Sequence, residues 1–130
     1  MFEVNYLAVA VAAVAVFVVS TVYYMAFAKQ TSTLHPAYAD SARPPAWKML
    51  VEIVRSLILA TVVACLASKL EIDDATGGVL LGLSLWIGFP FVLLTGSVIW
   101  EKVPPRLATI HAGDWLLKLL VISILVSVWR

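Results

Sequence analysis

Residues 75–100 read ATGGVLLGLSLWIGFPFVLLTGSVIW and hold no charged side chain. An α-helix rises about 1.5 Å per residue, so about 20 apolar residues cross the roughly 30 Å hydrocarbon core of a bilayer. The stretch is longer than this, and it lacks the strict alternation of apolar and polar residues that is typical of barrel strands. We therefore predict that it forms a transmembrane helix.

Three other stretches have the same apolar character, at about residues 4–28, 47–68 and 105–130. Of the 130 residues, 62% are hydrophobic and 13% are charged, whereas soluble domains carry about 25% charged residues. The sequence therefore predicts an all-α protein, a four-helix transmembrane bundle that forms a single transmembrane domain over residues 1–130. We expect the lipid bilayer to surround most of the chain. The net charge of +1 leaves no basic surface for nucleic acid.

The first apolar stretch has one feature of a secretory signal peptide, because Ala26-Phe27-Ala28 has the small-x-small form of a cleavage site. Its apolar run is longer than the roughly 7 to 15 residues of a signal-peptide core, and no Lys or Arg precedes Lys29. We therefore expect an uncleaved first helix.

The orientation follows from the basic residues near the helix ends, because cytoplasmic loops are enriched in Lys and Arg. The loops after the first and third spans carry more of these residues than the opposite side. We predict that both longer loops are cytoplasmic and that both termini lie outside, in the plasma membrane, most simply a bacterial inner membrane. The residues that decide this are Lys29, Arg43, Lys48, Lys102 and Arg106, against Lys69 and Arg130.

Charged residues inside the predicted spans are the first candidates for a functional site, because such residues mark pathways or ion pairs in membranes. At about 100° per residue, an acid and a base lie on one charged face of the second span, and three ionisable groups share a stripe of the fourth. We predict either a cytoplasm-facing polar vestibule for an ion, a proton or an anionic metabolite, or a set of structural ion pairs. The candidates are Glu52, Arg55, His111, Asp114 and Lys118.

Small residues predict where the helices approach each other, because they let two backbones come close in a membrane. Two stripes of glycine run along the third span, and alanines form a seam on the first. Pro90 removes a backbone donor and should kink the third span. The predicted packing residues are Gly78, Gly82, Gly88, Gly96, Ala8 and Ala12.

No catalytic motif is found in the sequence. It has no nucleophile elbow and no phosphate-binding glycine loop, and His35 and His111 are too isolated to form a metal pair. The single cysteine, Cys65, lies among apolar residues that favour a packing role. We therefore predict that the protein is not an enzyme and needs no cofactor or metal.

Three segments carry a family resemblance: NYLAVAVAA at 5–13, GLSLWIGF at 82–89 and IHAGDW at 110–115. They resemble a family of small four-helix membrane proteins from bacteria and fungi that is catalogued as a domain of unknown function. The resemblance implies four spans and an uncleaved first helix, and it implies no activity. It also implies that the charged stripe is particular to this chain, because we expect Asn and Tyr in that family at the positions of His111 and Asp114.

Two functions fit these features. The first is a homo-oligomeric transporter or channel for an ion or small solute, since four helices leave little room for a pathway within one chain. The alternative is a non-catalytic accessory or assembly subunit of a larger membrane complex. The two differ in what copurifies in mild detergent: the chain with itself, or the chain with other membrane subunits.

Overall fold

The computed structural model describes residues 4–35 and 45–129. Arg43 and Arg130, which enter the orientation prediction, lie outside this part. The described residues form helices and connecting turns, without a strand. The helices are α1 (Tyr6–Ala26), α2 (Ala28–Leu34), α3 (Ala46–Lys69), α4 (Ala75–Gly88), α5 (Pro90–Trp100) and α6 (Pro105–Val128).

Four segments are long and apolar enough to cross a membrane: α1, α3, α4 together with α5, and α6. This confirms the prediction of an all-α protein with four membrane-spanning helices. The first span ends earlier than predicted, at Ala26, and the short α2 follows it. The backbone at Phe27 leaves the helical conformation, with φ −101° and ψ 12°.

Two helix starts are fixed by side chains that accept hydrogen bonds from unpaired backbone amides. Asn5 Oδ1 accepts from the N–H groups of Leu7 and Ala8, each at 3.1 Å, and begins α1. Asp74 Oδ1 accepts from the N–H of Gly77 at 2.8 Å and begins α4. These caps satisfy donors that the first turn of a helix leaves without a partner.

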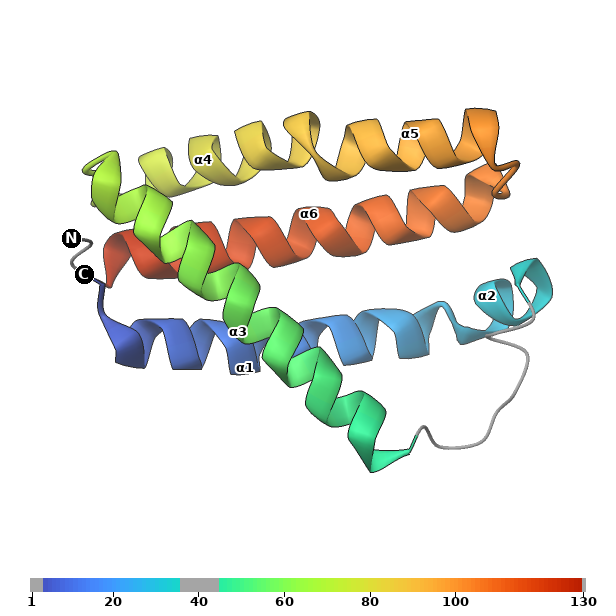
Figure 1. Cartoon of the computed structure of the whole chain (residues 1–130), viewed down its shortest axis with the longest axis horizontal. Coiled ribbons are helices and arrows are strands. Elements are labelled where there is room, and N and C mark those ends of the chain that lie inside the picture. Colours follow the sequence, from blue (N-terminus) through green and yellow to red (C-terminus); the bar gives the residue numbers. More distant parts are fainter. Residues whose placement is uncertain (1–3, 36–44, 130) are drawn as a thin grey trace.

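The third span is interrupted at Phe89, where φ is −122° and ψ is −77°. Pro90 is the first residue of α5, and its ring nitrogen cannot donate to the carbonyl of Trp86. In Figure 1, α4 and α5 follow one another almost in line. The predicted kink of the whole span at Pro90 stays a prediction.

The helix α6 is the centre of the arrangement. In Figure 1 it lies between α1 on one side and α4 with α5 on the other, and it contacts all of them. The helix α3 crosses this layer obliquely and packs against α1 and α6. Its buried residues begin only at Ser56, so its first turns do not pack against the bundle.

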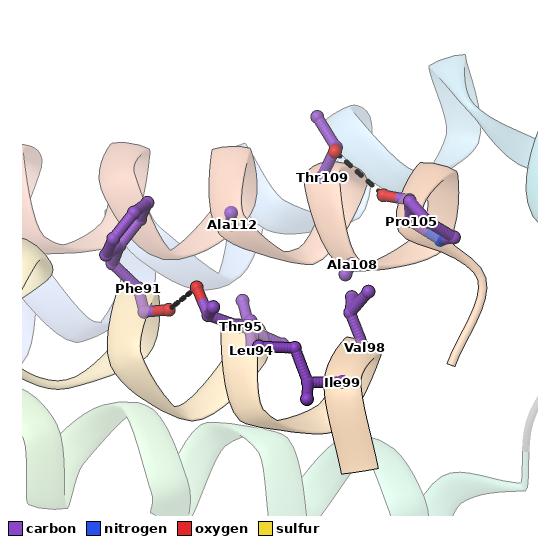
Figure 2. A pocket seen from close by; sticks show the side chains of 9 residues that line it. All are labelled: Phe91, Leu94, Thr95, Val98, Ile99, Pro105, Ala108, Thr109 and Ala112. Atoms are coloured by element: carbon purple, nitrogen blue, oxygen red, sulfur yellow. Dashed lines mark hydrogen bonds between the residues drawn. The ribbon is translucent and has the colours of Figure 1, made fainter. Parts of the chain in front are cut away.

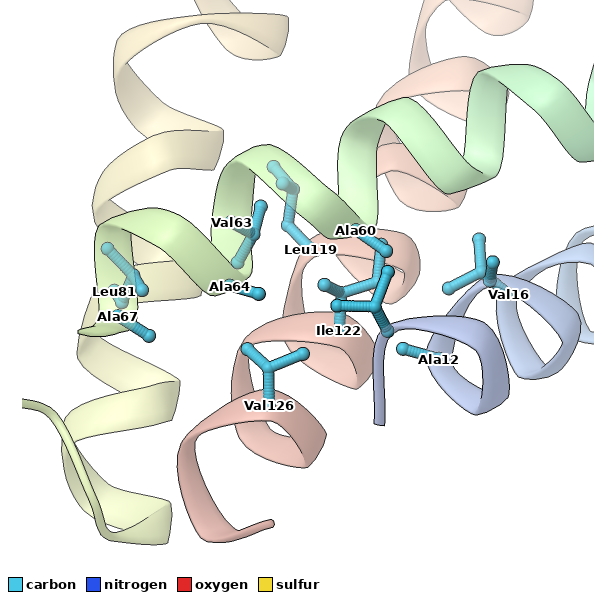
Figure 3. Packing of buried hydrophobic residues seen from close by; sticks show 12 residues of the cluster. Ala12, Val16, Ala60, Val63, Ala64, Ala67, Leu81, Leu119, Ile122 and Val126 are labelled. Carbon is cyan, nitrogen blue, oxygen red and sulfur yellow. The ribbon is translucent and has the colours of Figure 1, made fainter. Parts of the chain in front are cut away.

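The apolar core occupies the half of the bundle nearest the turn from α3 to α4. It combines small and branched side chains from four helices, which interlock in Figure 3. Its labelled members are Ala12, Val16, Ala60, Val63, Ala64, Ala67, Leu81, Leu119, Ile122 and Val126. Ala8 and Ala12 are both buried on the inner face of α1.

The predicted packing glycines fall into two groups. A Cβ added at Gly78 would lie 2.8 Å from Ser123 O and from Ile124 Cα, and one at Gly82 would lie 3.0 Å from Leu119 O. These two positions therefore let the backbone of α4 approach that of α6. A Cβ at Gly88 or Gly96 would meet no atom within 4 Å. Helical periodicity turns Gly88 away from α6, so Gly88 and Gly96 do not pack against another helix of the described chain.

Candidate functional site

A buried carboxylate joins α1 to α6 in the half of the bundle away from the apolar core. The side chain of Asp114 is 2% exposed. The hydroxyl of Ser20 donates to Asp114 Oδ1 at 2.6 Å, and Lys118 Nζ lies 2.9 Å from Asp114 Oδ2. Each carboxylate oxygen thus has a donor, as a buried charge requires.

Lys118 is also largely enclosed, with 14% of its side chain exposed. Its ammonium group lies 4.9 Å from the centre of the Trp115 ring, a distance that allows a cation–π interaction. The helical spacing explains the ion pair, because residues four apart lie on the same face of a helix. Asp114 and Lys118 therefore form one unit on α6, and Ser20 reaches it from α1.

A second pair lies one turn nearer the start of α6. The hydroxyl of Tyr24 and Nδ1 of His111 are 2.6 Å apart. His111 lies within electrostatic range of Asp114, Lys118 and His35, the last of which follows α2. The three ionisable groups predicted to share a stripe of the fourth span thus lie together, and α1 supplies hydroxyl partners for two of them.

Two further hydrogen bonds tie neighbouring helices to the backbone of α6. The hydroxyl of Tyr23 donates to the carbonyl of Ile110 at 2.7 Å, and Trp86 Nε1 donates to the carbonyl of Ala112 at 2.9 Å. Gly113 makes the first contact possible, because a Cβ there would collide with the Tyr23 hydroxyl. We call the side chains of Ser20, Tyr23, Tyr24, Trp86, His111, Asp114 and Lys118 the polar cluster.

Glu52 and Arg55 do not belong to the polar cluster. They form an ion pair with each other on α3, where 45% of the Glu52 side chain and 57% of the Arg55 side chain are exposed. Within the described residues, no ion pair joins them to Asp114 or Lys118. The oblique course of α3 is the reason, because it carries the first turns of α3 away from α6 (Figure 1).

The five predicted residues are therefore split between two places, and Asp114 is buried rather than open to a vestibule. A groove of about 250 Å³ does exist, but it lies between α5 and α6. The hydroxyls of Thr95 and Thr109 donate to the carbonyls of Phe91 and Pro105 within their own helices, as Figure 2 shows. The groove thus presents an apolar lining and shares no residue with the polar cluster.

No group of three metal-ligating side chains is found among residues 4–35 and 45–129. Sequence reasoning missed Ser20, Tyr23, Tyr24 and Trp86 as members of this site. A signal for Tyr23 was present in Gly113, a glycine within the predicted fourth span, because a Cβ there would collide with the Tyr23 hydroxyl. Nothing comparable marks Ser20.

The fold and the polar cluster define a small multi-pass membrane protein with four apolar helices. The model of the family described as "Protein of unknown function (DUF1761)" matches residues 7–127, so the chain belongs to that family. The resemblance drawn from the sequence is therefore confirmed. No curated protein and no solved structure matches the chain.

Proposed function

We propose that the protein is a homo-oligomeric transporter that moves protons across the membrane, and that Asp114 carries the proton. The observation that supports this is a carboxylate, 2% exposed, held between Ser20 and Lys118 inside a membrane-spanning bundle. Ionisable residues in such positions are characteristic of proton relays.

The enclosure of the polar cluster favours a proton over a larger solute. A metabolite needs a cavity lined by polar groups, whereas the groove of about 250 Å³ is apolar and lies elsewhere. A proton needs only a row of groups that bind it in turn. His111 with Tyr24, and Asp114 with Lys118, form such a row along α6.

Proton binding would change the contact between α1 and α6. When Asp114 Oδ2 takes up a proton from the aqueous side, the carboxylate becomes a neutral acid and its ion pair with Lys118 ends. The cluster then carries one additional positive charge, with Lys118 next to Trp115. Release of the proton restores the ion pair, so the two states differ in how firmly Ser20 and Lys118 hold Asp114.

The proposed orientation has both termini outside and lies in the plasma membrane. It is supported by Lys29, Lys102 and Arg106, which belong to α2, the turn before α6, and the start of α6. Figure 1 places these segments at one end of the bundle. The positive-inside rule assigns that end, with the polar cluster near it, to the cytoplasm.

The test is proton flux into proteoliposomes that hold a pH-sensitive dye, driven by a potassium gradient and valinomycin. We expect the wild-type protein to conduct protons and Asp114→Asn to conduct roughly 100-fold more slowly, the usual effect of removing a proton-transfer group. Asp73→Asn is the matched control, because Asp73 is exposed in the turn before α4 and should leave the flux unchanged.

Asp114→Asn leaves the Lys118 charge without its partner, so a second variant separates folding from flux. Asp114→Asn/Lys118→Met removes both charges and should fold like the wild type while remaining inactive. Wild-type flux in either variant, or no flux in wild-type vesicles above that of empty ones, would overturn the proposal.

The alternative function is a non-catalytic accessory or assembly subunit, and one observation favours it. The first turns of α3 expose large apolar side chains together with an ion pair, as a helix does when it meets another chain. A subunit of this kind would copurify with other membrane proteins. After reconstitution, its vesicles would conduct protons no faster than empty vesicles.

A further inference from the structure

One outward face of α3 carries apolar and charged side chains together. Val51, Arg55, Ile58 and Val62 follow each other at spacings of four, three and four residues, so they form one stripe along the helix. All four are exposed. We call them, with Glu52 beside them, the α3 stripe. The buried residues of α3, such as Ser56, Ala60 and Val63, lie on the other side of the helix.

Lipid is a poor neighbour for this stripe. At 1.5 Å per residue, Glu52 and Arg55 lie about 9 and 14 Å along α3 from Ala46. A guanidinium group has five N–H donors, and Nη1 donates to Glu52 Oε1. About half of each side chain is exposed. Acyl chains offer no acceptor for the other donors and no donor for the carboxylate. Residues 4–35 and 45–129 supply no second ion-pair partner, so the pair needs a polar neighbour beyond them.

We propose that the α3 stripe is the contact between two copies of this chain, in which Glu52 of each copy pairs with Arg55 of the other. This names the contact surface of the homo-oligomer in the proposed function, and it does not depend on proton transport.

Symmetry supports a second copy as the occupant. In a two-fold dimer, residue i of one copy meets residue j of the other, and j meets i. Glu52 and Arg55 are an acid and a base about 4.5 Å apart along the axis, within the reach of an arginine side chain. Two copies in one membrane share their orientation, so their α3 helices run parallel and present these charges at the same depth. A single chain thus supplies both halves of two salt bridges.

The apolar part of the stripe fits the same arrangement. Spacings of four and three residues are those of side chains that interlock between two parallel helices. One polar position in such a seam fixes the register of the two helices. Val51, Ile58 and Val62 flank Arg55 in this way. The stripe lies on the side of α3 opposite its buried residues, and its side chains are exposed, so no helix of the described chain covers it.

The experiment uses two charge variants of the full chain with different affinity tags. Glu52→Arg gives a stripe with two bases, and Arg55→Glu gives a stripe with two acids. Each variant should bind its own copies roughly tenfold more weakly than the wild type, because like charges then face each other. The two variants expressed together should copurify in mild detergent about as well as wild-type copies do.

Coexpression of the two variants distinguishes the proposed contact between copies from an ion pair that acts only within one chain. Neither variant retains an ion pair within the chain, so an internal role predicts no recovery when the two are combined. Absence of recovery, or equal self-association of both variants and the wild type, would overturn the proposal. Capture of a different membrane protein by the stripe, in place of a tagged copy, would also overturn it.

Crosslinking tests the same contact without changing the charges. In a Cys65→Ala background, Val62→Cys should form a disulfide between two copies under mild oxidation. Thr61→Cys is the matched control, because Thr61 is exposed, lies one residue from Val62 along α3, and is off the stripe. Equal crosslinking of both positions, or none at Val62→Cys, would contradict the proposed surface. Copurification and proton flux are separate measurements. If the wild-type protein conducts protons but the two charge variants fail to copurify with each other, only the contact proposed here is overturned.

Discussion

The two halves of the bundle hold their helices together in different ways. Near the turn from α3 to α4, small and branched apolar side chains interlock, and Gly78 and Gly82 let α4 approach α6 closely. In the other half, α1 and α4 reach α6 through hydrogen bonds, one of which is accepted by Asp114, whose buried ion pair with Lys118 lies within α6.

This difference matters because lipid offers no hydrophobic driving force between helices. The apolar half therefore depends on close fit, and its contacts do not change when a proton is added. The polar half depends on groups whose charge a proton does change. We infer that the apolar half acts as the fixed part of the molecule and that the polar half is the part that responds.

The largest effect expected from this difference is at Lys118. Lys118→Met leaves the carboxylate of Asp114 buried without its counter-charge and should destabilise the fold by about 3 kcal/mol. Asp114→Asn/Lys118→Met should return the stability to within about 1 kcal/mol of the wild type, because neutral neighbours of similar volume pack well. Unfolding in mixed micelles measures both variants. Equal losses in the single and double variants would show that volume, not charge, governs this half.

In the apolar half the expected effect depends on fit alone. Gly78→Leu should destabilise the protein by about 1 to 3 kcal/mol, because the new side chain meets the backbone of α6. Gly96→Leu introduces the same residue where a Cβ meets no atom within 4 Å, so the unfolding free energy should change by less than about 0.5 kcal/mol. Equal unfolding free energies for Gly78→Leu and Gly96→Leu would show that close fit between α4 and α6 does not stabilise the apolar half.

A smaller effect is expected from the hydrogen bond between Trp86 and α6. Trp86→Phe removes the donor to the Ala112 carbonyl and should lower the unfolding free energy by about 0.6 kcal/mol, a typical value for such a bond in a membrane. Trp100→Phe is the control, because Trp100 is exposed at the end of α5. A loss as large as that of Lys118→Met would mean that hydrogen bonds, and not the ion pair, dominate the polar half.

The number of spans could be predicted from the sequence because uncharged length is a property of each segment alone. The grouping of His111, Asp114 and Lys118 followed in the same way, because their spacing on one helix fixes their shared face. Both features depend on no other part of the chain.

The separation of Glu52 and Arg55 from these residues could not be predicted, because it depends on the angle at which α3 crosses α1 and α6. That angle is set by the surfaces of several helices together. Ser20 was missed for the same reason, since a lone serine on α1 gains its role only when Asp114 lies opposite. The break before α2 is a local backbone feature at Phe27 that hydropathy does not mark.

The central claim is that the carboxyl group of Asp114 binds and releases a proton within the folded protein. Infrared difference spectroscopy of the reconstituted protein tests it directly, because a protonated carboxylic acid has a C=O stretch that a carboxylate lacks. We predict that acidification of the wild-type protein produces this band with one component from Asp114 beside those of the other Asp and Glu side chains, that Asp73→Asn retains that component, and that Asp114→Asn removes it. An unchanged band in Asp114→Asn would contradict the account.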